Sequence, residues 1–224
     1  MVDRIVTGFL NTNTYLFSHW KKGCVIIDPA GSIEEIISHI EIKNFRPLAI
    51  ICTHGHFDHI AGISQLKYHY KAEGIDIPIF IHPLDSEYVS PAGYERHMQD
   101  ISMLGVEFHS LFHGFLQNLP QYDHLLEEGD TILDTDLTVI HTPGHTPGGI
   151  SIYSESDLIL FSGDTLFFEG VGRTDLPGGN ADILLQSIRE KLFSLPEDTR
   201  VFPGHGPYTT IEREKNHNPF LVRG

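Results

Sequence analysis

The sequence predicts an α/β protein, and three observations support this fold class. Apolar, β-branched segments at residues 48–53 (LAIICT) and 79–82 are typical of buried strands, and a helix is expected at 60–70 between them. A strand, a helix and a strand in succession indicate a βαβ unit with parallel pairing. Glycine-rich loops that carry His or Asp follow several strands. The length of 224 residues fits one large domain, residues 1–224.

The first fifty residues are expected to form strands and one helix. Residues 2–6, 14–17 and 24–28 predict an opening meander of three strands. Ser32 is expected to cap a helix that runs to about residue 42, with Glu35 completing a capping box. The helix carries an apolar stripe that we assign to the core: Ile33, Ile36, Ile37 and Ile40.

At about residues 83–126 the apolar residues are scattered at only roughly helical spacings, and we interpret this stretch as a helical insertion. This stretch holds His97, His109, His113 and His124, but none of them has the tight spacing of metal ligands. A long, irregular segment of this kind would form one wall of an active site or an oligomer contact. We therefore expect the insertion to pack against the rest of the domain rather than to form a second metal site.

Regular structure is expected to resume in the last hundred residues. The pattern predicts a hairpin at 131–141, strands at 150–153 and 158–161, and a last strand at 200–202. Asn180 is expected to cap a helix, and a short polar helix closes the chain.

Composition limits the partners and the compartment. With 15 Lys and Arg against 30 Asp and Glu, the formal charge is −15, which repels nucleic acid. No apolar run approaches the roughly 20 residues that span a bilayer, so no membrane association is expected. The first residues lack the features of a secretory signal. We therefore expect a cytoplasmic protein, monomeric or a small homo-oligomer.

The strongest motif is HGHFDH at residues 54–59, directly after the predicted strand at 48–53. Four of its six side chains can bind a metal: His54, His56, Asp58 and His59. Histidines two apart with a glycine between them suit a loop rather than the helical spacing of HExxH. The motif therefore predicts a metal site at the carboxyl end of a strand.

Three later residues share this placement, each after an apolar strand and among small residues: His145 in HTPGHTPGG, Asp164 in SGDTLF and His205 in PGHGP. With the motif at 54–59 they make seven candidate ligands, more than one tetrahedral ion takes. Two adjacent ions bridged by one carboxylate account for all seven. Nitrogen and oxygen donors suit zinc, iron or manganese, and zinc is expected first. Asp28 precedes Pro29, and we assign it to shaping a turn.

These residues resemble the metallo-β-lactamase superfamily, whose fold is a four-layer αββα sandwich. The resemblance implies that His54, His56 and His145 hold one metal, that Asp58, His59 and His205 hold the other, and that Asp164 bridges them. Aspartate at 164, where lactamases usually carry cysteine, points away from antibiotic hydrolysis and toward the glyoxalase II (hydroxyacylglutathione hydrolase) branch. The segments TNTYLF and GVGRTDLPGG are similar to small bacterial proteins of that branch.

The resemblance implies a metal-dependent hydrolase for a small-molecule thioester such as S-lactoylglutathione. A hydroxide shared by two ions would attack the thioester carbonyl, with Asp58 and Asp164 as the catalytic carboxylates. Arg173 and Lys215 would contact the substrate, although each also fits a solvated surface cation. Few residues follow His205, whereas glyoxalase II proper has a C-terminal helical domain that helps to bind glutathione. The resemblance therefore does not fix the identity of the substrate.

One alternative changes the class of reaction. Persulfide dioxygenases resemble this branch, including the GRTD segment at residues 172–175. The resemblance implies a single iron held by His54, His145 and Asp164, with O2 as cosubstrate. A nuclease of the same fold is disfavoured by the charge, and a structural metal protein is disfavoured because structural zinc sites are usually rich in cysteine.

Overall fold

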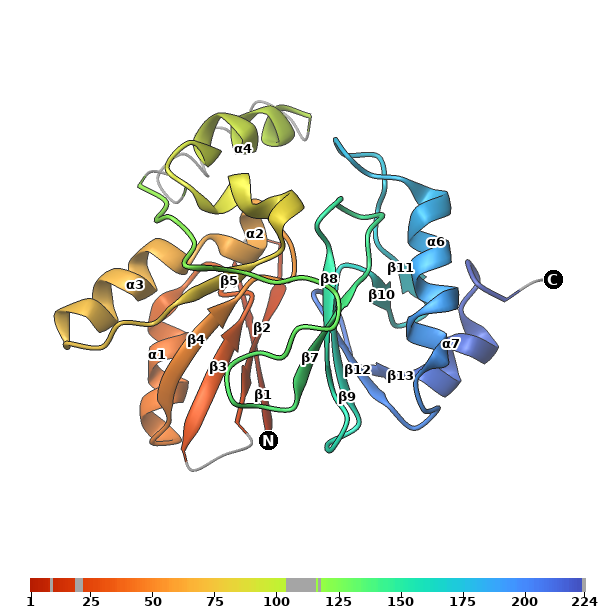
Figure 1. Ribbon diagram of the computed structural model, residues 1–224, viewed down its shortest axis with the longest axis horizontal. Helices are drawn as coiled ribbons and strands as arrows, with labels where there is room; N and C mark the ends of the chain where they lie inside the picture. Colours follow the sequence, from red (N-terminus) through yellow and green to blue (C-terminus); the bar gives the residue numbers. More distant parts are fainter. Residues whose placement is uncertain (9, 19–21, 104–115, 117, 223–224) are drawn as a thin grey trace. The chain divides into compact units, whose positions relative to one another are not determined.

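The computed structural model describes residues 1–224 except 9, 19–21, 104–115, 117 and 223–224 (Figure 1). The described chain forms two compact units. The first comprises Met1–Ile81 with Ser86–Leu125, and the second comprises His82–Asp85 with Leu126–Gly224. The expectation of one domain over the whole chain stays a prediction.

The first unit contains a six-stranded sheet whose strands follow each other in chain order. The first three pair antiparallel, as the predicted meander requires, and the later neighbours pair parallel, as predicted for the βαβ unit. The strands are β1 (Val2–Thr7), β2 (Thr12–Phe17), β3 (Gly23–Ile27), β4 (Arg46–Ile51), β5 (Ile79–Ile81) and β6 (His124–Leu125).

Two helices of this unit, α1 (Ile33–Ile42) and α3 (Ile63–Ala72), lie along one side of the sheet (Figure 1). Ile36 of α1 and Leu66 of α3 are fully buried in one core with Ile50 of β4. The predicted apolar stripe is therefore core. The helix expected at 60–70 is α3, which begins three residues later and ends two residues later than expected, and a separate short helix α2 (Phe57–Ile60) precedes it.

Of two local predictions, the capping box is wrong and the hairpin is confirmed. Ser32 is the N-cap of α1, but its hydroxyl donates to Glu34 and makes no cap bond, so the capping box with Glu35 does not form. The hairpin expected at 131–141 does form. Thr131 and Thr138 make an antiparallel bridge, and backbone hydrogen bonds join Ile132 to Leu137 and Val139 to Asp130, although only the second arm is a regular strand.

The second unit contains a five-stranded sheet in the order β13, β12, β9, β8, β7. Its pairs are antiparallel except β12 with β9, which is parallel. The strands are β7 (Leu137–His141), β8 (Ile150–Ser154), β9 (Ile159–Gly163), β12 (Arg200–Pro203) and β13 (Thr209–Thr210), with a separate pair β10 (Leu166–Phe167) and β11 (Gly170–Val171).

The helices of the second unit are α6 (Ala181–Glu190), the turn η2 (Leu192–Ser194) and α7 (Ile211–His217). Asn180 caps α6 as predicted, because its side chain accepts a hydrogen bond from the amide of Ile183. Leu184 and Ile188 of α6 pack in one core with Leu160 of β9. One hydrophobic face of the helix therefore covers this sheet.

The segment expected to be a helical insertion begins with η1 (Pro83–Val89) and α4 (Gly93–Ser102). Part of the remainder, including His109 and His113, lies outside the described residues. Among the helices that the structure describes, none is both long and apolar enough to cross a membrane.

Candidate metal centre

Strand direction places the site residues of the first unit at one edge of its sheet. Asp28 follows β3 and His54 follows β4, and these strands are parallel, so both lie beyond carboxyl ends on the same side. Strand β2 runs the opposite way, which puts its first residue, Thr12, at that edge too. One edge thus collects polar groups from segments that are far apart in sequence.

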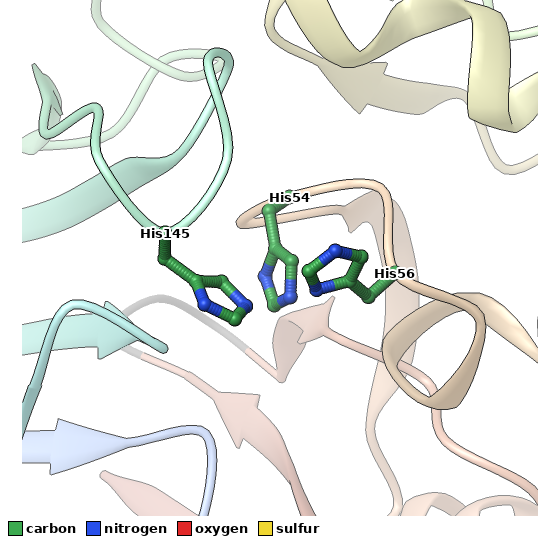
Figure 2. A group of neighbouring side chains, drawn as sticks. All are labelled: His54, His56 and His145. Atoms are coloured by element: carbon green, nitrogen blue, oxygen red, sulfur yellow. The ribbon is translucent and has the colours of Figure 1, made fainter. Parts of the chain in front are cut away.

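The motif at residues 54–59 begins in the loop after β4 and continues into α2, so that His54 and His56 lie on the loop while Asp58 and His59 lie in the helix. Figure 2 shows the rings of His54 and His56 on this loop. The ring centroids are 4.8 Å apart, and the ring planes are nearly perpendicular. His54, His56 and His59 are 2%, 6% and 0% exposed, so all three lie in the interior. A surface turn that is merely rich in histidine would leave these rings in solvent, and this interpretation is therefore excluded.

Asp28 organises this loop. Its carboxylate accepts hydrogen bonds from the amide and hydroxyl of Thr53, at 2.7 and 2.6 Å, and lies 2.9 Å from Nδ1 of His59. The Thr53 hydroxyl, having donated to Asp28, accepts from Nδ1 of His54 at 3.1 Å. Both histidines therefore carry the proton on Nδ1 and present a lone pair on Nε2, as metal ligands require.

The assignment of Asp28 to shaping a turn captures only part of its role. Asp28 has φ 49° and lies at a tight turn, but its buried carboxylate also fixes the orientation of two predicted ligands. The ligand atoms of Asp28, His54 and His59 lie within 4.8 Å of one another. Because both oxygens of Asp28 accept bonds from Thr53 and one also from His59, we interpret Asp28 as an orienting group rather than a ligand.

Asp58 lies in the first turn of α2, and Thr12 positions its carboxylate. The Thr12 hydroxyl donates to Oδ2 of Asp58 at 3.0 Å, and the same oxygen lies 3.5 Å from Nε2 of His59. Thr12 is fully buried. It belongs to the TNTYLF segment that the sequence marked as similar to a family, but its contact with Asp58 was not predicted.

The second unit gathers its predicted ligands in the same way. Strands β7, β9 and β12 run in one direction, so the loops that follow them lie at one edge of this sheet. These loops carry His145, Asp164 and His205. Figure 2 shows His145 on the loop after β7. Nδ1 of His145 lies 2.7 Å from the backbone carbonyl of Arg173, which can only accept, so Nε2 of His145 presents the lone pair.

Asp164 lies between the two histidines of this unit. Its Oδ2 is 3.6 Å from Nε2 of His145 and 3.5 Å from Nε2 of His205. These separations are too long for good hydrogen bonds. They match the distance of about 3.4 Å between two ligand atoms on one ion with bonds near 2.1 Å. The Asp58–His59 pair has the same spacing, so the donor sets of both units fit divalent ions.

The two predicted substrate contacts already have partners. The Arg173 guanidinium donates two hydrogen bonds of 2.7 Å to Asp175 and lowers the pKa of that exposed carboxyl to about 2. Nζ of Lys215 lies 3.6 Å from Glu197. Their binding of substrate stays a prediction. The contribution of Arg173 that the sequence did not reveal is its backbone carbonyl, which orients His145.

The structure describes two of the four histidines in the stretch 83–126, and both pack against other residues of the fold. His97 is buried and donates from Nε2 to the carbonyl of Tyr88, and burial lowers its pKa to about 4. His124 stacks on Phe80. Neither belongs to a cluster of potential ligands in the described chain. For these two, packing is the better interpretation, as the spacing suggested.

Buried imidazoles with fixed tautomers, together with carboxylates at ligand spacing, fit a metal-binding protein of the α/β class. The family model of the metallo-beta-lactamase superfamily matches residues 7–205. The chain therefore belongs to the metallo-β-lactamase superfamily, and its fold is of this type, as the resemblance implied.

Two curated relatives cover nearly the whole chain. The probable metallo-hydrolase YqgX of Bacillus subtilis is 38% identical over 97% of this chain and 96% of its own length. The hydroxyacylglutathione hydrolase GloC of Haemophilus influenzae is 36% identical over 96% and 95%. These relatives agree with the glyoxalase-II-like branch and identify the chain as a metallo-hydrolase.

Three solved structures are similar as well. The BLEG-1 B3 metallo-beta-lactamase has a TM-score of 0.82 with 38% identity and covers both chains completely. TTHA1623 in a di-iron-bound form has a TM-score of 0.79 with 36% identity over 98% of this chain and 100% of its own. ETHE1 from Myxococcus xanthus has a TM-score of 0.74 with 25% identity over 98% and 83%.

Proposed function

We propose that this metallo-hydrolase cleaves a small-molecule thioester, such as S-lactoylglutathione, at a centre of two divalent ions. The relative GloC, a hydroxyacylglutathione hydrolase similar over nearly the whole chain, supports the substrate class. The buried histidines with a lone pair on Nε2 support the metal centre. Zinc is the metal that we propose, with iron as the alternative because TTHA1623 has a di-iron-bound form.

The geometry of Asp164 carries the proposal. We assign His54, His56 and His145 to the first ion and Asp58, His59 and His205 to the second. His145 and His205 then belong to different ions, and one oxygen of Asp164 lies at ligand spacing from both, 3.6 and 3.5 Å. A carboxylate placed in this way suits a bridge between two ions.

Two ions in this centre would supply a water of lowered pKa and would polarise the thioester carbonyl. Asp58, held by the Thr12 hydroxyl, would orient the attacking water and accept its hydrogen bond. Asp28 and Thr53 keep the rings of His59 and His54 in place throughout the reaction. No serine or cysteine nucleophile is required.

Basic side chains of the second unit would bind the carboxylates of the substrate. We propose Arg173 and Lys215 for this role. Arg173 is half exposed, with 49% of its side-chain surface accessible, so its guanidinium can exchange Asp175 for a ligand carboxylate. Both partners, Asp175 and Glu197, are largely exposed, so little burial opposes the exchange.

The first experiment measures metal content by elemental analysis on protein purified without added metal. The same preparation is assayed with S-lactoylglutathione, with a chromogenic β-lactam because of the similarity to BLEG-1, and for oxygen uptake with glutathione persulfide. The proposal expects two ions per chain and thioester hydrolysis that Asp58→Ala abolishes. Asp76→Ala, which removes an exposed carboxylate of the same unit, is the matched control and should leave hydrolysis unchanged.

The second candidate is a persulfide dioxygenase, favoured by the similarity to ETHE1. A single iron held by His54, His145 and Asp164 would serve that reaction. One iron per chain with oxygen uptake, and without thioester hydrolysis, would replace the first proposal by this one. Hydrolysis of the β-lactam alone would contradict both.

A further inference from the structure

Asp85 is a fully buried carboxylate that lies outside the predicted ligand set. It is 0% exposed and lies in η1. Its Oδ2 accepts a hydrogen bond of 2.7 Å from the hydroxyl of Thr146, and its Oδ1 accepts one of 2.7 Å from the amide of Gly148. Both donors belong to the same compact unit as Asp85, although more than sixty positions separate them in sequence.

The two donors lie on the loop that carries His145. Thr146 is the next residue after His145, and Gly148 follows two residues later. On the other side of His145, the carbonyl of Gly144 accepts a hydrogen bond from the amide of Asn180, at the start of α6. The carbonyl of Arg173 accepts from the ring of His145. His145 is thus held through its ring, through the residue before it and through the residues after it.

The contact between Asp85 and this loop leaves no spare room. A Cβ atom at Gly148 would lie 2.6 Å from the backbone nitrogen, Cγ and Oδ1 of Asp85, so only glycine allows this approach. Thr146 is 1% exposed. A buried charge is costly unless it is hydrogen-bonded, and charge-assisted bonds are the stronger ones. Asp85 and the loop therefore constrain each other tightly.

We propose that Asp85 is a positioning residue for His145, setting the backbone path of residues 146–148 so that Nε2 of His145 stays aimed at its metal ion. This inference rests on the ligand role of His145 in the proposed function. Asp85 touches neither the substrate nor the metal in this scheme, and it acts only through Thr146 and Gly148. Small displacements of a ligand weaken metal binding, and groups that support ligands are worth about 10- to 100-fold in affinity.

The test compares variants that differ in one hydrogen bond. Asp85→Asn replaces an acceptor oxygen by an NH2 group, and Thr146→Val removes the hydroxyl at nearly constant volume. We expect both to weaken the binding of one of the two zinc equivalents about tenfold in competition with a chromophoric chelator. Thr146→Ser keeps the hydroxyl and should restore wild-type affinity.

The matched control is Asp136→Asn. Asp136 is another aspartate of the second unit that secures a turn, accepting from the hydroxyls of Ser154 and Ser156 beside β7 and β8. It should lower stability without changing the affinity for zinc. A general loss of stability would affect Asp85→Asn and Asp136→Asn alike. A loss of zinc affinity in Asp85→Asn alone therefore distinguishes a positioning role from a merely structural one.

A second readout needs no metal. In the metal-free protein, amide hydrogen exchange at Gly148 should accelerate in Asp85→Asn, because this amide donates directly to Asp85. Accelerated exchange with unchanged zinc affinity in both Asp85→Asn and Thr146→Val would overturn the inference and leave the proposed function standing. Conversely, two bound ions without thioester hydrolysis in the wild type would overturn the proposed function, while a tenfold loss of affinity in the variants would still support the inference.

Discussion

The carboxylate of Asp28 lies 2.9 Å from Nδ1 of His59 and accepts a hydrogen bond from that nitrogen. The two residues are 31 positions apart and both are buried. The contact fixes the tautomer of His59 and so decides which of its nitrogens is offered to a metal. A residue without a ligand role thereby controls one that is a proposed ligand.

Asp28→Asn should weaken metal binding about 10- to 100-fold, with a parallel fall in turnover. Asparagine tolerates φ 49°, so the turn should survive. It has one acceptor oxygen for the donors of Thr53 and His59, and its NH2 group would face one of them. Metal titration of the chelator-treated protein measures the effect. Asp76→Asn, at an exposed position, is the control, and equal affinities in the two variants would contradict the orienting role.

Gly55→Ala should destabilise the protein by about 1–3 kcal/mol through overpacking. A Cβ at Gly55 would lie 2.4 to 2.7 Å from ring and Cβ atoms of Tyr88. The Tyr88 ring cannot swing away easily, because its hydroxyl donates to Asp100 at 2.6 Å and accepts from Arg96. Urea unfolding measures the free energy. The loss should shrink in a Tyr88→Ala background, and Gly170→Ala, where the nearest atom is 3.6 Å away, should cost much less.

His97 should make stability fall as the pH falls from about 6.5 toward 4. Burial, together with the nearby charge of Arg96, lowers the pKa of folded His97 to about 4. Between the unfolded and folded pKa values the unfolded chain binds the proton and the native protein does not, so acid favours unfolding by at most about 3 kcal/mol. His97→Gln keeps a donor for the Tyr88 carbonyl but does not titrate. If urea midpoints of the variant and the wild type fall in parallel between pH 7 and 5, the prediction is wrong.

Glu214→Ala should destabilise the second unit by about 2–4 kcal/mol, since it leaves buried donors unsatisfied. The fully buried carboxylate of Glu214 accepts from the hydroxyl of Thr209, the amide of Glu169 and the side chain of Asn218. Thermal unfolding of the chelator-treated protein measures the loss. Glu212→Ala, an exposed position on the same helix, should have little effect.

Arg173→Ala should raise KM about fivefold for a thioester that carries carboxylates and leave kcat nearly unchanged, as expected for an exposed ion pair. The backbone carbonyl that orients His145 survives the substitution, so the proposed metal centre stays intact. A neutral thioester provides the comparison, because its KM should not respond. An equal rise of KM for both substrates would argue against a charge contact with the substrate.

The sequence alone predicted the parts of this protein that are encoded locally. Apolar, β-branched segments located most strands, and Asn180 indicated the start of α6 as its N-cap. The candidate ligands follow predicted strands directly or within a few residues: the HGHFDH motif, His145, Asp164 and His205. A residue that follows a strand closely in sequence must lie near the end of that strand, so this placement could be predicted. The capping box at Ser32 failed because its hydroxyl donates to the side chain of Glu34 and accepts no hydrogen bond from the amides of the first turn, and the folded backbone decides between these geometries.

The tertiary structure decided how the predicted ligands are oriented. Asp28 reaches His59, Thr12 reaches Asp58, and Asp85 reaches the loop of His145 across long stretches of chain. The Arg173 carbonyl is a backbone atom, so no side-chain pattern announces it. Residue types reveal which groups can bind a metal, because that capacity is chemical and local. The tautomer and direction of these groups depend on partners that become neighbours only when the chain folds and segments far apart in sequence meet at one edge of a sheet.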